Sequence, residues 1–327
     1  MRKTVVILIL SVFSVGTSAQ KTTVYETMGY LEVLDDAFYN WVSKEAKIEI
    51  IAEGFTWTEG PVWVPDEQCL LFSDVPKNIA YKWTEKRGTE IFLNPSGYSG
   101  SENKQGSNGL ILNPKGELLL CQTGNRVVAK LNGAISNPKS NFVFLADDFN
   151  GKRFNAPNDL VMDSLSNIYF TDPNFGLDLS EKELDFQGVF RLNTQGQVTL
   201  LTEKWPAPNG IGLSPDNRKL YVANSDPKLL ISYDLNDAGE VSNEEVLMDL
   251  TSLWEKSIAK QLPDGIAVNK AGIIFLAGPD GVLLIQPDGK HLGTLKTNKL
   301  TSNCTFNEDE TVLYITCHEL VLRVRLN

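Results

Sequence analysis

The sequence predicts an all-β fold, a six-bladed β-propeller, and three observations support this. A phrase made of a polar residue, a small residue and a short apolar strand occurs six times in the 327-residue chain. Each copy continues through a turn-forming cluster into a second apolar strand, centred twelve or thirteen residues after the polar member. The copies recur at intervals of roughly 40–50 residues, which is typical of propeller blades.

The polar member of every copy carries a side-chain oxygen. We call these members the axial residues, because the innermost strand of each blade runs along the central channel and matching positions converge on its axis. They are Glu59, Asn108, Asn158, Asn209, Asp264 and Asn303. Converging oxygens predict a site for a hard cation.

The last copy supplies only three strands, over residues 303–306, 312–316 and 320–326. The alternating segment Lys47-Ile48-Glu49-Ile50-Ile51 predicts a fourth strand that completes this blade and leaves no edge unpaired. The mixed apolar spacing before it predicts a short helix in an N-terminal arm, residues 20–46, lying against the outside of the barrel. The propeller domain then spans residues 47–327.

The first residues are typical of a secretory signal peptide. Arg2 and Lys3 precede an apolar run from Val5 to Val15, and small residues follow up to Ala19. The run is shorter than the roughly 20 residues that span a bilayer, which disfavours a membrane anchor. We expect removal of residues 1–19 and export to the periplasm or the extracellular space.

The charge of the chain excludes some partners. The formal charge of −11 becomes −13 without Arg2 and Lys3, which argues against nucleic acid or an anionic membrane surface. The four cysteines form no C-x-x-C pair, and the sequence assigns no disulfide. The oligomeric state stays open.

Two connections are long enough for lids or binding loops, residues 94–107 and 173–187. The second connection is equally well explained as a solvated excursion.

Four axial residues suit a calcium ion. Calcium takes 6–8 oxygen ligands, typically a mixture of carboxylates, amide carbonyls and water. The predicted ligands, two carboxylates and two amides, are Glu59, Asn158, Asn209 and Asp264. Zinc fits less well, because the chain has only two histidines, although Mn²⁺, Zn²⁺ and Mg²⁺ stay open. Asn108 and Asn303 are equally well explained as turn caps or cross-blade contacts.

Several phrases resemble the gluconolactonase/regucalcin family. They are Glu59-Gly60-Pro61-Val62-Trp63, Arg153-Phe154-Asn155-Ala156-Pro157-Asn158-Asp159, Pro208-Asn209-Gly210 and Pro263-Asp264-Gly265. The resemblance runs from about Glu32 to the C-terminus. It implies a six-bladed propeller with one divalent ion, usually calcium, that hydrolyses lactones, and some relatives hydrolyse organophosphates.

The resemblance also implies roles for single residues. It makes Glu59, Asn209 and Asp264 metal ligands and places Asn158 against metal or substrate, with Arg153 and Asp159 as its neighbours. We predict a substrate-binding set of Asn158, Arg153 and Asn108. Many bacterial members carry Glu-His where this chain has Gln122-Thr123, a departure that concerns the substrate more than the reaction.

The general base has two candidates. The resemblance names Asp264, but a carboxylate bound to a dication has a depressed pKa and is a weak base. Asp159 lies next to a predicted ligand and is the second candidate.

The sequence therefore predicts a metal-dependent hydrolase that opens a lactone. The ion would polarise the carbonyl while a carboxylate activates water. The alternatives are a phosphotriesterase-type hydrolase on the same site, or a non-catalytic, calcium-stabilised propeller that binds a sugar or a protein. No G-x-S-x-G motif and no phosphate-binding glycine loop are present.

Overall fold

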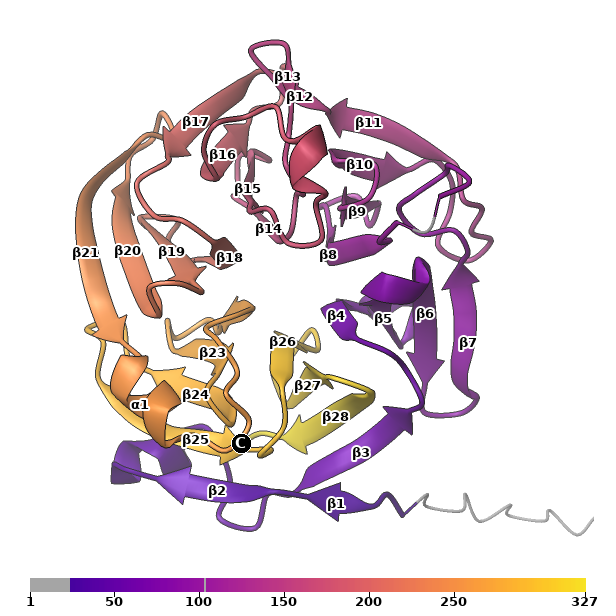
Figure 1. The fold of residues 1–327 in the computed structure, drawn as a ribbon. Coiled ribbons are helices and arrows are strands. Elements are labelled where there is room, and N and C mark those ends of the chain that lie inside the picture. Colours follow the sequence, from indigo (N-terminus) through magenta and orange to yellow (C-terminus); the bar gives the residue numbers. More distant parts are fainter. Residues whose placement is uncertain (1–23, 103) are drawn as a thin grey trace, which may run out of the picture.

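The protein is a ring of six β-sheets around a central channel (Figure 1). The computed structural model describes residues 24–102 and 104–327. The predicted signal peptide lies outside these ranges and stays a prediction, as does the division of the chain at residues 19 and 46. The all-β class and the six blades are confirmed.

Blades I to IV each contain four antiparallel strands that follow one another in the sequence. Blade I contains β4 (Thr58–Val64), β5 (Cys69–Asp74), β6 (Ile79–Thr84) and β7 (Gly88–Leu93). Blade II contains β8 (Ser107–Leu112), β9 (Leu118–Gln122), β10 (Val127–Leu131) and β11 (Phe142–Ala146). Blade III contains β14 (Leu160–Met162), β15 (Ile168–Asp172), β16 (Gly188–Leu192) and β17 (Val198–Thr202). Blade IV contains β18 (Pro208–Leu213), β19 (Lys219–Asn224), β20 (Leu229–Leu235) and β21 (Val241–Asp249).

Blades V and VI each gain strands from the N-terminal part of the chain. Blade V contains β22 (Ile266–Val268), β23 (Ile274–Gly278), β24 (Gly281–Ile285), β25 (His291–Lys296) and, outermost, β2 (Tyr30–Val33). Blade VI contains β26 (Thr301–Phe306), β27 (Val312–Cys317), β28 (Leu320–Arg325), β3 (Ile48–Glu53) and β1 (Thr27–Met28). A separate hairpin joins β12 (Asp148–Phe149) to β13 (Lys152–Arg153).

The predicted ring closure is confirmed. Strand β3 pairs with β28, so that Glu53 lies opposite Leu320 and Ile48 lies opposite Val324. The preceding arm differs in detail from the expectation. Its helix is a single 3-10 turn, η1 (Asp36–Asn40), and β1 and β2 instead add to the outer edges of β3 and β25. Both edges would otherwise present unpaired backbone groups, which these strands satisfy.

The apolar core lies between neighbouring blades. All six residues of β5 are buried, because this strand packs against blades on both sides. Between blades II and III, Phe154, Phe170 and Phe190 form one aromatic cluster, and the last two rings stack with centroids 5.4 Å apart. All four cysteines are buried free thiols.

Few of the described residues are helical. The α-helix α1 (Thr251–Lys256) connects blades IV and V, and three further 3-10 turns are η2 (Pro65–Glu67), η3 (Val75–Lys77) and η4 (Leu179–Glu181). Within residues 24–102 and 104–327, no helix has the length and apolar character needed to cross a membrane.

Candidate active site

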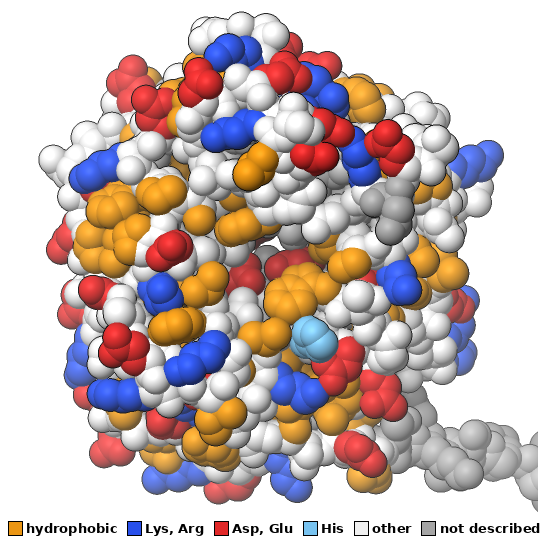
Figure 2. Space-filling view, viewed as in Figure 1, with side chains coloured by type: hydrophobic (Ala, Val, Ile, Leu, Met, Phe, Trp, Pro, Cys, Tyr) orange, Lys and Arg blue, Asp and Glu red, His pale blue; other side chains and the backbone are white. Residues whose placement is uncertain are grey.

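Five of the six predicted axial residues line one cavity at the end of the channel where the inner strands begin. Its volume is about 650 Å³, and Figure 2 shows it as the central hollow, with acidic side chains in red at its depth. The five residues, each at most 7% exposed, are Glu59, Asn108, Asn158, Asn209 and Asp264. The predicted convergence of oxygens from different blades is therefore present.

In blades I, II, IV and V a glycine follows the axial residue and allows this convergence. Gly60 has φ 49°, and a Cβ added there would lie 1.9 Å from the carbonyl oxygen of Asn108 in the next blade. A Cβ on Gly210 would lie 2.1 Å from the carbonyl oxygen of Asp264. Neighbouring inner strands approach so closely that a larger residue would push the blades apart.

In blade VI the axial position is occupied by the residue before the predicted one. Thr301 lies opposite Cys317 and Asn303 lies opposite Thr316, so Ser302 occupies the bulged position that Asn108 occupies in blade II. The Ser302 hydroxyl donates to the carbonyl oxygen of Thr58 at 2.6 Å. Blade VI thus contributes a hydroxyl that ties two inner strands together, and Asn303 does not line the large cavity.

Asn303 and Asp159 occupy the position that is glycine in the other blades. Both line a second cavity of about 240 Å³, whose other lining residues come from the later parts of the inner strands. The Asn303 amide lies between the two acids, with Nδ2 3.4 Å from Glu59 Oε2 and 3.5 Å from Asp159 Oδ2. The candidate base Asp159 therefore lies in the wall of the second cavity and not in that of the large one.

Three buried carboxyl groups surround the channel axis. Burial raises the pKa of Glu59 to about 8 and that of Asp159 to about 7. Burial, followed by the charges of Glu59 and Asp159, raises the pKa of Asp264 well above its ordinary value. Within the described ranges, no Lys or Arg side chain forms a salt bridge with any of the three. A bound cation would stabilise the ionised forms of these three carboxyl groups.

The residues of the large cavity fit a hard cation. Every axial side chain there offers oxygen, and Oδ1 of Asn108 is buried without a hydrogen-bond partner among the described residues. Asn209 donates through Nδ2 to Ser225 Oγ at 3.1 Å, which leaves its Oδ1 available as a ligand. The described chain contains no cluster of three His, Cys, Asp or Glu arranged for a metal. A cation here would therefore depend on amide oxygens, as calcium sites do.

Gln261 is a site residue that the sequence did not indicate. Its Nε2 donates to Asp264 Oδ2 at 2.7 Å, and both side chains are buried. Gln261 belongs to the loop of residues 257–262, which also contributes Lys260 and Leu262 to the cavity wall. Because Gln261 precedes its blade in an irregular loop, no strand pattern pointed to it.

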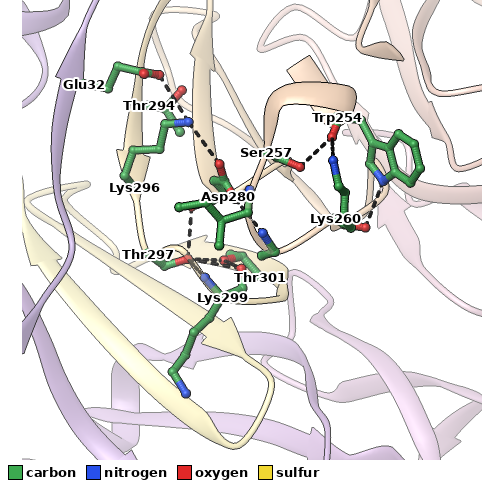
Figure 3. Close-up of polar contacts among 12 residues, drawn as sticks. Glu32, Trp254, Ser257, Lys260, Asp280, Thr294, Lys296, Thr297, Lys299 and Thr301 are labelled. Atoms are coloured by element: carbon green, nitrogen blue, oxygen red, sulfur yellow. Dashed lines mark hydrogen bonds and ion pairs between the residues drawn. The ribbon is translucent and has the colours of Figure 1, made fainter. Parts of the chain in front are cut away.

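A polar network fixes this loop (Figure 3). Asp280 Oδ1 accepts hydrogen bonds from the backbone N–H groups of Ile258 at 2.7 Å and Ala259 at 2.8 Å. Lys296 Nζ lies 3.5 Å from Asp280 Oδ2 and 3.4 Å from an oxygen of Glu32. Since Glu32 lies on β2, the N-terminal arm supports a wall of the cavity.

Both long connections contribute residues to the rim of the cavity. Gln105 comes from the first connection and Phe175 from the second, and Lys104 joins them through Glu181 Oε1 at 2.7 Å. Both connections therefore border the cavity, as binding loops do.

Arg153 does not line this cavity. Neither do Gln122 and Thr123, the two residues that differ from the Glu-His of many bacterial members. Arg153 is exposed, and its Nη2 donates to the carbonyl oxygen of Asn125 at 2.7 Å. Gln122 donates to the Ser96 carbonyl at 3.2 Å, and Thr123 donates to the Pro157 carbonyl at 3.1 Å. The structure does not bring Arg153 to the predicted substrate-binding set.

Comparisons with known proteins identify the family of the chain. The family model described as "SMP-30/Gluconolactonase/LRE-like region" matches residues 57–319. A gluconolactonase from Zymomonas mobilis is 39% identical over 292 residues, which are 85% of this chain and 81% of that protein. A solved gluconolactonase from Xanthomonas campestris has a TM-score of 0.82 at 24% identity, covering 94% of this chain and 99% of its own. The calcium-binding protein regucalcin from Agrobacterium tumefaciens has a TM-score of 0.66 at 17% identity, covering 85% and 93%. The last two likenesses support the fold. Since the family model spans most of the sequence, the chain belongs to the SMP-30/gluconolactonase/LRE-like family.

Proposed function

We propose that this protein hydrolyses a lactone with the help of a divalent cation, for which Ca²⁺ is the best candidate. One observation carries the proposal: five oxygen-bearing side chains converge in a cavity of about 650 Å³. Two of them are carboxyls that form no salt bridge with a Lys or Arg of the described ranges. A cavity of this size accommodates a small ring compound. The 39% identity to a gluconolactonase supports the lactone as substrate class.

The cation would be held by Glu59, Asn158, Asn209 and Asp264. When bound, it would polarise the lactone carbonyl and stabilise negative charge on that oxygen. The binding of calcium by the regucalcin neighbour is consistent with this choice.

Asp264 is the proposed base. Its carboxylate lies in the large cavity and is oriented by the hydrogen bond from Gln261. Asp264 would take a proton from the water that adds to the carbonyl carbon. As the ring carbon–oxygen bond breaks, the proton returns to the departing ring oxygen, and the product is a hydroxy acid. Because Asp159 lines the second cavity, the geometry favours Asp264 over Asp159.

The cavity wall would position the substrate and exclude water. Asn108 presents an amide group beside the proposed cation ligands, of which Asn158 would also face the substrate. The apolar members of the wall are Trp57, Val75, Pro76, Phe175, Leu262 and Leu300. Apolar walls strengthen the electrostatic interactions that they enclose.

The test is a lactone panel with controlled metal content. The purified protein is stripped with EDTA and assayed on glucono-1,5-lactone with a pH indicator, before and after addition of Ca²⁺, Mn²⁺, Zn²⁺ or Mg²⁺. We expect turnover to disappear with the chelator and to return with metal. The melting temperature should rise with Ca²⁺, since a ligand of the folded state stabilises it by mass action. Full turnover after exhaustive chelation would refute the metal dependence.

The same assay separates the alternatives. Faster turnover of an organophosphate triester than of any lactone would assign the phosphotriesterase-type reaction. A calcium-dependent rise in melting temperature without turnover of either class would leave the non-catalytic binding propeller.

Export is a separate part of the proposal and rests on the composition of residues 1–19. Mass spectrometry of natively expressed protein should find Gln20 at the N-terminus in an exported fraction. Detection of intact Met1 in a cytoplasmic fraction would contradict it.

A further inference from the structure

His318 lines the large cavity, and the proposed reaction assigns it no role. It follows β27 at the turn into β28, with φ 52° in the left-handed region that residues with a Cβ adopt at a cost. Its carbonyl oxygen accepts hydrogen bonds from the N–H of Thr58 at 2.9 Å and from Thr58 Oγ1 at 3.0 Å. The backbone of His318 is therefore fixed to the strand that carries Glu59.

The imidazole ring of His318 is also fixed in orientation. Its Nδ1 contacts Glu319 Oε2, and Lys299 Nζ contacts the other oxygen of Glu319. The indole ring of Trp57 meets the imidazole edge to face, with centroids 5.5 Å apart and an interplanar angle of 90°. Two polar side chains and one aromatic ring thus hold the imidazole of His318, whose side chain is 44% exposed.

These contacts determine which nitrogen of the His318 ring donates a hydrogen bond and which accepts one. A carboxylate only accepts hydrogen bonds, so Nδ1 carries the hydrogen in the neutral imidazole. The other nitrogen, Nε2, is then an acceptor on the side of the ring opposite Glu319. Much of the surrounding wall is apolar, with Trp57 and Leu300 among its members. An oriented acceptor in such surroundings suits a hydroxyl group.

We propose that His318, oriented by Glu319, accepts a hydrogen bond from a hydroxyl of the substrate and thereby discriminates a hydroxylated ring from an unsubstituted one. The inference rests on the proposed lactone hydrolysis and adds the residue that recognises a substrate hydroxyl. His318 is a specificity residue in this scheme, separate from the axial oxygens that serve the carbonyl. An unmet polar partner in the wall disfavours a ligand without the matching hydroxyl.

The first test is a ratio of specificity constants. The kcat/KM on glucono-1,5-lactone is divided by that on δ-valerolactone, which has no hydroxyl. In His318→Phe this ratio should fall about 3- to 10-fold, the usual effect of one neutral hydrogen bond. His318→Gln, which keeps an acceptor, should restore most of it, and Glu319→Gln should give an intermediate ratio. A purely structural role of His318 would lower both constants together, and an unchanged ratio overturns the inference.

The second test needs neither turnover nor a variant that folds. The chain has two histidines, so the imidazole nitrogens of the wild-type protein give a simple NMR spectrum. Addition of the lactam of gluconic acid, which resists hydrolysis, should shift the Nε2 signal of His318, whereas δ-valerolactam should not. Equal responses to both lactams, or none, overturn the inference. If no lactone is hydrolysed, the proposed function fails while the lactam titration still decides whether His318 binds a hydroxyl.

Discussion

Replacement of Asp264 by Asn is the sharpest test of the proposed chemistry. Asn keeps an oxygen that can accept the 2.7 Å hydrogen bond from Gln261, so the shape of the site is preserved while one charge and the basic oxygen are lost. A positioned base contributes about 10²–10⁴-fold to the rate, equivalent to about 3–5 kcal/mol of barrier. We therefore expect kcat for glucono-1,5-lactone to stay lowered by that factor at saturating Ca²⁺.

The assay is a Ca²⁺ titration of the stripped protein at fixed lactone, which separates metal affinity from the rate at saturation. Asp159→Asn is the matched control: it removes a second buried carboxyl, but one that lines the opposite cavity. Its rate should change by less than about 3-fold, far below the contribution of a base. Full rescue of Asp264→Asn by Ca²⁺, combined with a lasting loss in Asp159→Asn, would transfer the base role to Asp159.

Three further outcomes are expected. Gln261→Leu removes the hydrogen-bond donor of the Asp264 carboxylate. Because hydrogen bonds to charged groups contribute about 1.5–3 kcal/mol, kcat/KM should fall about 10- to 150-fold. An unchanged kcat/KM would show that Gln261 does not orient the base. Arg323→Met removes a buried guanidinium that Glu49 Oε2 holds at 2.7 Å. The acidic partners Glu49 and Glu85 are 23% and 55% exposed and stay hydrated, so the free energy of unfolding measured with urea should drop by about 1.5–3 kcal/mol, the contribution of hydrogen bonds to charged groups; an unaltered denaturation midpoint would contradict the reasoning. The hydrogen bond from Lys299 holds the pKa of Glu319 at about 2, below its ordinary 4.5. Ionised Glu319 therefore stabilises the fold above pH 4.5, and this contribution is lost as the pH falls towards 2. The melting temperatures of wild type and Glu319→Gln should differ at pH 6 and converge near pH 2, and a difference that stays constant with pH would argue against this role of Glu319.

The repeat of the sequence was sufficient to predict the blades and most of the axial ring. A polar residue followed by glycine marks a bulged inner strand in blades I, II and IV, where pairing shifts by one residue. In blade VI the bulge comes one residue earlier, at Ser302 instead of Asn303. Ser302-Asn303 and Ser107-Asn108 look alike in sequence, and only the pairing with the second strand distinguishes them.

Other features depend on contacts between distant residues. The strands at Thr27–Met28 and Tyr30–Val33 are too short for a periodic pattern, and they form because edges of blades V and VI need partners. Gln261 and His318 lie in connections, where side-chain direction follows from hydrogen bonds to Asp280, Glu319 and Thr58 and not from periodicity.

The pairing of β3 with β28 constrains the order of events during synthesis. Residues 48–53 leave the ribosome early and residues 320–325 leave it near the end, yet these strands are hydrogen-bonded neighbours. Blades I to IV can form as the chain emerges, because their strands are consecutive, whereas blade VI must wait for its last strand. Until then β3 presents an open edge that can recruit strands from other nascent chains. A translation product that stops short of β28 would therefore keep this edge exposed and open to pairing with another chain.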